Sequence, residues 1–218
     1  MWGLFPWGNF PTSTQSIVID MDECLIHTFD SKEYPNVYSN VLSTLPVSLR
    51  HHVFRVDVEG EVIYGLIRPE LTEFLKYCFT RFDYVILWSA GTDEYVKLVC
   101  ERIFSFTNQM PKHVLTRAFC EYDEDMGVYK KPLVKLSQFS SDLTLNKTFF
   151  VDDRDYSGFN NKSNQIIIPG FSPEPTAESI IYELTHDHAL ADLMEWFELE
   201  SVQRASDVRT LNKKKIFK

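Results

Sequence analysis

Two aspartates, Asp20 and Asp22, follow a short apolar run, and their spacing allows two roles in one reaction. An ionised Asp20 can attack phosphorus and form a phosphoryl-aspartate, which divides a difficult hydrolysis into two easier steps. Asp22 can protonate the leaving oxygen and later activate water. Acidic residues are also common where a strand runs into a loop, so the pair needs support from other residues.

A second acidic pair, Asp152 and Asp153, ends another apolar run. Carboxylate and carbonyl oxygens are the ligands that Mg²⁺ prefers. Asp20, the backbone carbonyl of Asp22, and Asp152 or Asp153 can therefore share one ion with a substrate phosphate. Without a cation these carboxylates would repel a phosphate, so we predict a Mg²⁺ site built from the four aspartates.

Ser89 follows a third apolar run and precedes a predicted helix. Its hydroxyl and the backbone N–H groups from Ala90 onward can hold phosphoryl oxygens. Lys131, or its neighbour Lys130, supplies the positive charge expected beside a phosphoryl-aspartate. Two adjacent lysines are more often simply solvated, so the pair by itself is a weak signal.

The three apolar runs, 16–20, 84–88 and 148–152, show no polar alternation, which is typical of strands buried on both faces of a parallel sheet. Between these runs, apolar residues recur at helical spacing in two segments. We predict one helix with Pro69 at its first position and another that is capped by Thr92. These patterns predict an α/β fold with a central parallel sheet flanked by helices. Ligands of such sheets bind beyond the carboxyl ends of the strands, where the acids and Ser89 lie.

The remaining segments complete the expected organisation. Residues 29–50 are predicted to be a long surface loop, and 53–64 a small β-hairpin insertion. The acidic run 121–125 is predicted to be a solvent-facing hairpin tip and not a metal site. One C-terminal helix is predicted over 176–197.

We divide the chain into three parts. Residues 1–15 form an aromatic-rich segment with Phe5, Trp7 and Phe10. Residues 16–200 form the catalytic domain, and 201–218 form a polar, basic and frayed tail.

Charge and cysteine content exclude several classes of protein. The net charge of −9 argues against direct binding of nucleic acid, because phosphate backbones attract clustered Lys and Arg. Four scattered cysteines indicate neither a disulfide framework nor a zinc site, which favours an intracellular setting. No run approaches the roughly 20 apolar residues that span a bilayer, so we expect a soluble protein with no membrane contact.

In this chain order the motifs resemble the haloacid dehalogenase (HAD) superfamily, and within it the phosphatases of the RNA polymerase II C-terminal domain, both the TFIIF-associating and the small, NLI-interacting factor-like types. The resemblance runs from about Ser16 to Phe197. Its motifs are Val18 to Thr28, Arg68-Pro69, Leu87 to Ala90, Tyr129 to Leu133 and Val151 to Arg154.

The resemblance implies a Rossmann-like sheet, Mg²⁺ as cofactor and a phosphoprotein substrate, for which the polymerase C-terminal repeat is a candidate. It implies the following roles: Asp20 as nucleophile, Asp22 as general acid and base, Ser89 as phosphate ligand, Lys131 as stabilising cation, and Asp152 with Asp153 as the metal-site pair. Arg117 is a further candidate for substrate contact.

Cys24 departs from the family pattern, because threonine is usual there. The change could loosen the turn that holds the acid pair or leave a thiol beside the site. Two alternatives to a protein phosphatase stay open: a phosphatase of a small phosphometabolite, and a catalytically silent module that binds a phosphopeptide or another partner.

Overall fold

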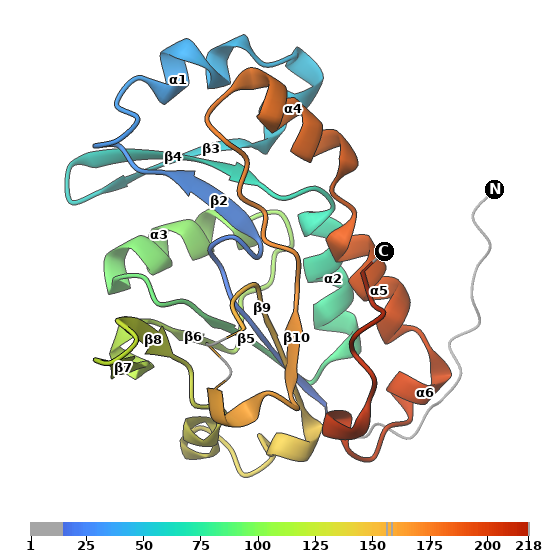
Figure 1. The fold of residues 1–218 in the computed structure, drawn as a ribbon. Helices are drawn as coiled ribbons and strands as arrows, with labels where there is room; N and C mark the ends of the chain where they lie inside the picture. The colour runs from blue at the N-terminus through green and yellow to red at the C-terminus, as the bar shows by residue number, and fades with distance from the viewer. Residues whose placement is uncertain (1–14, 156, 158, 218) are drawn as a thin grey trace, which may run out of the picture.

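The computed structural model describes residues 15–155, 157 and 159–217. The predicted aromatic segment, including Phe5, Trp7 and Phe10, lies outside this range except for Gln15, which is buried. Figure 1 shows the fold, coloured from the N-terminus to the C-terminus.

Five parallel strands form the central sheet in the order β10-β9-β1-β5-β6 (Figure 1). Their bounds are Ser16–Ile19 (β1), Tyr84–Trp88 (β5), His113–Leu115 (β6), Thr148–Asp152 (β9) and Gln165–Ile167 (β10). Ile19 lies beside both Leu87 and Val151, so β1, β5 and β9 end at the same level. The predicted α/β fold with a central parallel sheet is confirmed.

Both faces of the sheet are buried, which explains the uninterrupted apolar runs. Ile17 and Ile19 of β1 belong to a cluster with side chains from three helices, while Val18 packs on the opposite face with Trp88 and Phe150. The three helices are α2 (Leu71–Arg81), α3 (Asp93–Phe104) and α5 (Ala189–Phe197). A 3₁₀ helix, Leu133–Gln138, contributes to the second cluster.

Helix α2 begins later than predicted. Its N-cap is Glu70, whose backbone is left-handed with φ of 63°, so Pro69 precedes the helix instead of opening it. Helix α3 begins directly after Thr92, as predicted, although the Thr92 side chain makes no capping hydrogen bond.

The prediction of one C-terminal helix over 176–197 is wrong. The chain forms α4 (Ala177–His186) and α5, separated at Asp187. The Asp187 carboxylate accepts a hydrogen bond from Ala189 N at 3.0 Å and also binds the buried Arg68. The contact with Arg68 explains why the helix ends at Asp187.

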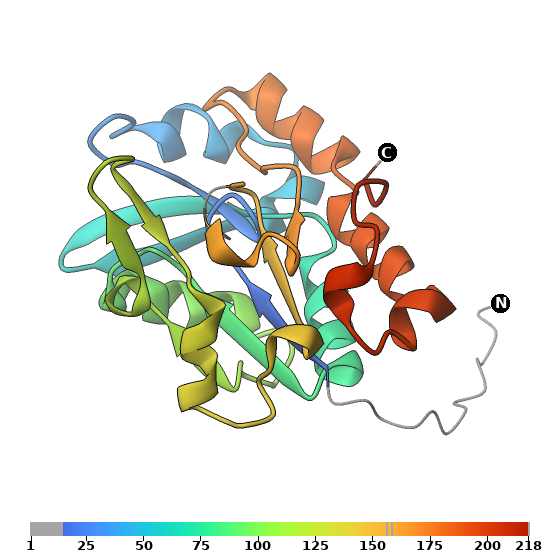
Figure 2. The same cartoon turned by 60° about the horizontal axis from the view of Figure 1, so that its bottom comes forward.

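The expected frayed tail also packs on the body. It contains α6 (Glu200–Gln203) and a 3₁₀ helix, Val208–Thr210. Val202, Val208 and Ile216 are buried in the main core. Removing these apolar side chains from water favours packing of the tail. In both views this segment, drawn in red, lies on the opposite side of the molecule from the hairpin of β7 (Glu121–Asp123) and β8 (Val128–Lys130) (Figures 1 and 2).

A smaller antiparallel sheet has the order β2-β4-β3. Its strands are Ile26–Phe29 (β2), Val53–Val58 (β3) and Glu61–Ile67 (β4), so the predicted hairpin insertion is present and gains β2 as a third strand.

Residues 29–50 are not a plain surface loop. They hold α1 (Val37–Asn40) and the 3₁₀ helices Leu42–Thr44 and Val47–His52. Leu42 and Leu45 are buried in a cluster with Phe171 and with Ile180 of α4. The scattered Ser, Pro and Asn of this segment predicted a loop, although a few of its apolar residues are buried.

A separate hairpin joins β7 (Glu121–Asp123) to β8 (Val128–Lys130). Glu124 and Asp125 at its turn are exposed, so the acidic run forms a solvent-facing tip as predicted. Across the part of the chain that the structure describes, no helix is both long and apolar enough to cross a membrane.

Candidate active site

The predicted site residues meet where β1, β5 and β9 end. Most of them line a cavity of about 520 Å³, but Ser89 and Asp153 are not among its lining residues. Asp20, Asp22, Lys131 and Asp152 line it. Its other lining residues come from the loops after β1, β5 and β9, from β2, from both hairpins, from α3 and from the segment after β6: Glu23, Thr28, Val58, Ile63, Ala90, Gly91, Thr92, Tyr95, Arg117, Gly127, Val128, Tyr129, Arg154 and Ser157.

Lys131 lies between two acids. Its Nζ is 2.5 Å from Asp20 Oδ1 and 2.7 Å from Asp152 Oδ2, and all three side chains are at most 8% exposed. The backbone fixes the acids, because Asp20 N donates to Val151 O and Arg154 N donates to Asp152 Oδ1, both at 2.9 Å. The sequence therefore identified a lysine that the fold places beside the predicted nucleophile.

Electrostatics at this corner are unbalanced. Burial raises the pKa of Asp20 well above its ordinary value; Asp152 and Asp22 add to this, while Lys131 opposes it. Burial disfavours the charged form of Lys131, but Asp152 and Asp20 outweigh it and raise the pKa of the lysine. Lys131 is thus a fixed cation, and a second positive charge would help to keep Asp20 ionised.

Three carboxylates converge as a metal site requires. Oxygens of Asp20, Asp152 and Asp153 all lie within 4.8 Å of one another. Asp153 Oδ1 is buried and has no hydrogen-bond partner among the described residues. Burial, with the neighbouring Asp152, raises the pKa of Asp153 to about 6. An oxygen-only donor set with an unpartnered acid oxygen fits a hard divalent cation such as Mg²⁺.

Both carboxylate oxygens of Asp22 accept hydrogen bonds from hydroxyl groups. Ser89 Oγ donates to Asp22 Oδ2 at 3.0 Å, and Tyr95 Oη donates to Asp22 Oδ1. Burial raises the pKa of Asp22, while the hydrogen bond from Tyr95 opposes that change. Both oxygens of the Asp22 side chain thus already have hydrogen-bond partners, and the Asp22 carbonyl as a ligand of the ion stays a prediction.

Ser89 lies behind the cavity wall. It is fully buried, and its Oγ accepts a hydrogen bond from Gly91 N at 2.9 Å while donating its single proton to Asp22. Ala90 and Gly91 line the cavity instead. Phosphate contact by Ser89 stays a prediction, and it requires the hydroxyl to turn away from Asp22.

Glu23, Tyr95 and Arg117 also line the cavity. Glu23 has a left-handed backbone with φ of 54°, and its carboxylate lies 3.2 Å from the Arg154 guanidinium. Arg117, the weak candidate for substrate contact, lines the cavity and donates to Ala90 O at 2.7 Å. Tyr95 fits the apolar stripe of α3 in the sequence, and nothing in that spacing indicates a role for its hydroxyl.

Cys24 does not place a reactive thiol in the cavity. Its side chain is fully buried in the main core, and burial raises its pKa well above the ordinary value. Its carbonyl accepts a hydrogen bond from Arg68 Nη1 at 2.8 Å, which anchors the turn after the acid pair.

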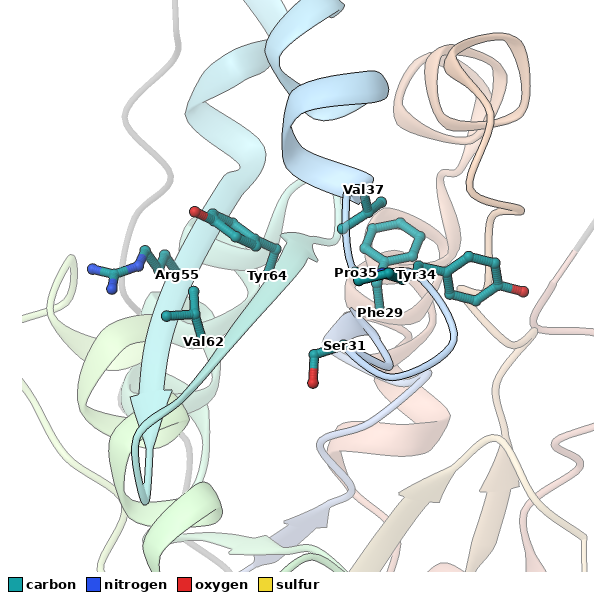
Figure 3. Close-up of a pocket in the computed structure, with 8 residues that line it drawn as sticks. All are labelled: Phe29, Ser31, Tyr34, Pro35, Val37, Arg55, Val62 and Tyr64. Atoms are coloured by element: carbon teal, nitrogen blue, oxygen red, sulfur yellow. The ribbon is translucent and has the colours of Figure 1, made fainter.

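A second hollow, of about 290 Å³, lies between the segment after β2 and the β3–β4 hairpin (Figure 3). Val62 and Tyr64 line it, whereas Ile63 between them lines the catalytic cavity, so the two hollows lie on opposite faces of the small sheet. Its lining includes Arg55 and no carboxylate, and so lacks the groups needed for phosphoryl transfer.

Comparisons with known proteins identify the family of this chain. The sequence model of the family described as NLI interacting factor-like phosphatase matches residues 15–209. No curated protein sequence gives a significant match.

Two solved structures share the fold. One is the fission yeast RNA polymerase II CTD phosphatase Fcp1, an arginine-to-alanine variant bound to beryllium fluoride, with 17% identity, a TM-score of 0.56, and coverage of 85% of this chain and 62% of that one. The other is Fcp1, described as an essential RNA polymerase II CTD phosphatase, with 18% identity, a TM-score of 0.51, and coverage of 92% and 59%.

The chain thus spans about three fifths of the Fcp1 chains it matches. These structures confirm the HAD-type fold that the sequence motifs implied. Because the family model covers most of the chain, the protein belongs to the NLI interacting factor-like phosphatases.

Proposed function

We propose that the protein is a Mg²⁺-dependent phosphatase of phosphoserine or phosphothreonine in proteins, and that it acts through a phosphoryl group on Asp20. The observation that carries this proposal is the position of Lys131 between Asp20 and Asp152, beside Asp153, whose Oδ1 is unpartnered among the described residues. The polymerase C-terminal repeat is the first substrate to test, because the structural neighbours are named as phosphatases of that domain.

The chain's own groups account for both steps. Asp20 attacks phosphorus, while Lys131 offsets the negative charge that gathers on the phosphoryl oxygens. Asp22 gives a proton to the leaving serine or threonine oxygen, then takes one from the water that attacks the phosphoryl-aspartate. Asp20, Asp152 and Asp153 would hold the cation, which when bound neutralises phosphate charge.

The cavity supports a protein substrate. It lies between the two hairpins, with Val58 and Ile63 on one wall and Val128 and Tyr129 on the other. Its apolar walls can hold the residues that flank a phosphorylated side chain.

Turnover of p-nitrophenyl phosphate with Mg²⁺, followed by a panel of phosphopeptides and small phosphometabolites, tests the proposal. We expect EDTA and Asp20→Asn each to abolish turnover, and Asp57→Asn, an exposed change on β3, to retain it. Full activity of Asp20→Asn contradicts the mechanism. Preference for a metabolite contradicts the substrate class, and cation binding without any turnover indicates a silent binding module.

A further inference from the structure

We propose that Tyr95 is a positioning residue for Asp22, and that its hydroxyl holds the Asp22 carboxyl in the orientation from which it protonates the leaving oxygen. This role rests on the proposed function of Asp22 as general acid.

Two hydroxyl groups fix the Asp22 carboxyl. Tyr95 Oη donates to Oδ1 and Ser89 Oγ donates to Oδ2 at 3.0 Å. The final torsion of an aspartate side chain is broad when nothing holds it. With one donor on each oxygen, the plane of the carboxyl is set by groups on two elements, Tyr95 on α3 and Ser89 after β5.

The proton of Tyr95 is assigned by its partners. An ionised Asp22 can only accept hydrogen bonds, so the Tyr95 hydroxyl proton points to Asp22. Thr28 Oγ1, which lies 3.3 Å from Tyr95 Oη, is then the donor to Tyr95. A chain of donors therefore runs from Thr28 on β2 to Tyr95 and on to Asp22. These bonds favour the carboxylate that forms when Asp22 releases its proton.

The loop after β5 is shaped to admit the Tyr95 ring. A Cβ at Gly91 would lie 2.8 Å from Tyr95 Cδ1 and 3.0 Å from Val96 Cγ2. Real carbon atoms do not approach so closely, so a side chain at position 91 would displace the ring. Packing thus fixes the ring independently of the hydrogen bonds.

Asp22, which Tyr95 positions, moves a proton in both steps of the reaction. The bond from Asp20 to phosphorus forms as the bond from phosphorus to the serine oxygen breaks, and the Asp22 proton moves to that oxygen to give a serine hydroxyl. Water then attacks phosphorus, releases phosphate and Asp20, and returns a proton to Asp22. A serine alkoxide is a poor leaving group, so its departure needs the first proton transfer. p-Nitrophenolate is a good leaving group and departs without it.

This difference gives a test that a purely structural role would not pass. For Tyr95→Phe, we expect kcat/KM for a phosphoserine peptide to fall about 10-fold or more, since a general acid contributes about 10²- to 10⁴-fold. With p-nitrophenyl phosphate, kcat/KM should change less than about 3-fold. This parameter reports only the steps up to the first irreversible one, and for this substrate those steps do not need the Asp22 proton. Asp22→Asn should show the same pattern more strongly, and adding Tyr95→Phe to it should have little further effect.

A further variant keeps the test decisive. Thr28→Val keeps the Tyr95 hydroxyl and removes only its donor, and we expect it to lower only the peptide reaction, by less than Tyr95→Phe does. Equal losses with both substrates, or no loss with either, would overturn the positioning role. Wild-type protein that hydrolyses neither substrate would refute the proposed function itself, and with it this role.

Discussion

The Arg68 and Lys131 clusters are both buried in the described part of the chain, and they differ in the balance of their charges. Arg68 is fully buried and pairs with one acid, Asp187, at 2.8 Å, while its other hydrogen bonds go to the carbonyls of Cys24 and Pro169. Every guanidinium nitrogen donates to the protein. Lys131 instead faces an excess of acid, because it lies between Asp20 and Asp152 at the edge of a cavity, and Asp153 adds a third carboxylate within 4.8 Å of those two acids.

This difference separates a structural ion pair from a reactive one. A buried charge that is matched by one opposite charge and by backbone partners leaves nothing for a ligand to satisfy. An acidic excess beside a cavity, with an unpartnered oxygen among the described residues, is unfavourable until a cation arrives. Arg68 therefore ties the turn after Asp22 to β10 and to the α4–α5 junction, while the Lys131 corner is suited to chemistry.

The largest change should follow the loss of Arg68. We expect Arg68→Met to lower the free energy of unfolding by about 3–5 kcal/mol, because Asp187 is left buried without its partner. Urea denaturation measures this effect. A loss below about 1 kcal/mol would show that the pair does not hold the fold.

A double variant sharpens the contrast. Arg68→Met with Asp187→Leu should regain part of the stability, since a buried pair can often be replaced by apolar residues. Recovery should be incomplete, because the carbonyls of Cys24 and Pro169 still lack a donor.

The next largest effect should be the loss of activity when Lys131 is replaced. We expect Lys131→Met to lower kcat about 10²- to 10³-fold, which corresponds to about 2.7–4 kcal/mol of transition-state stabilisation. Lys130→Met is the matched control, because Lys130 pairs with Asp123 in the hairpin, and it should cost less than about 10-fold. The reverse order of effects would assign the catalytic charge to Lys130.

Mg²⁺ should stabilise the acidic corner and leave the Arg68 cluster unaffected. At 100 times its dissociation constant, a ligand that binds only the folded state adds about 2.7 kcal/mol. We expect Mg²⁺ to raise the urea midpoint of wild type and of Arg68→Met alike, and to have little effect on Asp153→Asn. An unchanged wild-type midpoint would contradict the predicted metal site.

The smallest effect should come from an exposed pair. Arg55 lies 3.8 Å from Asp57, and both side chains are more than half exposed. Arg55→Ala should change stability by less than about 0.5 kcal/mol. It should also leave KM for a phosphopeptide unchanged, and a several-fold rise in KM would indicate that the second hollow in Figure 3 takes part in binding.

Local patterns in the sequence were enough to predict the central strands and to place the acids at their carboxyl ends. Apolar runs indicate buried strands, and the ends of these strands indicate the edge of the sheet where Asp20 and Asp152 meet. The identity of Lys131 came from the family motif, because a lysine pair by itself gives no direction.

Contacts between distant residues could not be predicted in the same way. The break at Asp187 depends on Arg68, which is 119 positions away, and no periodicity encodes that pair. Likewise, the burial of Leu42, Leu45 and Ile216 depends on surfaces that exist only in the folded chain. The hydroxyl of Tyr95 was overlooked because its ring fits an apolar stripe equally well.

The central claim, that Asp20 carries the phosphoryl group, can be tested by trapping. The protein is mixed with a phosphopeptide and Mg²⁺, quenched during turnover and reduced with borohydride, which converts an acyl phosphate to an alcohol. Peptide mass spectrometry should then find the alcohol at position 20 and leave Asp22, Asp152 and Asp153 unmodified. Reduction at one of those three, or none at all while hydrolysis proceeds, would contradict the mechanism.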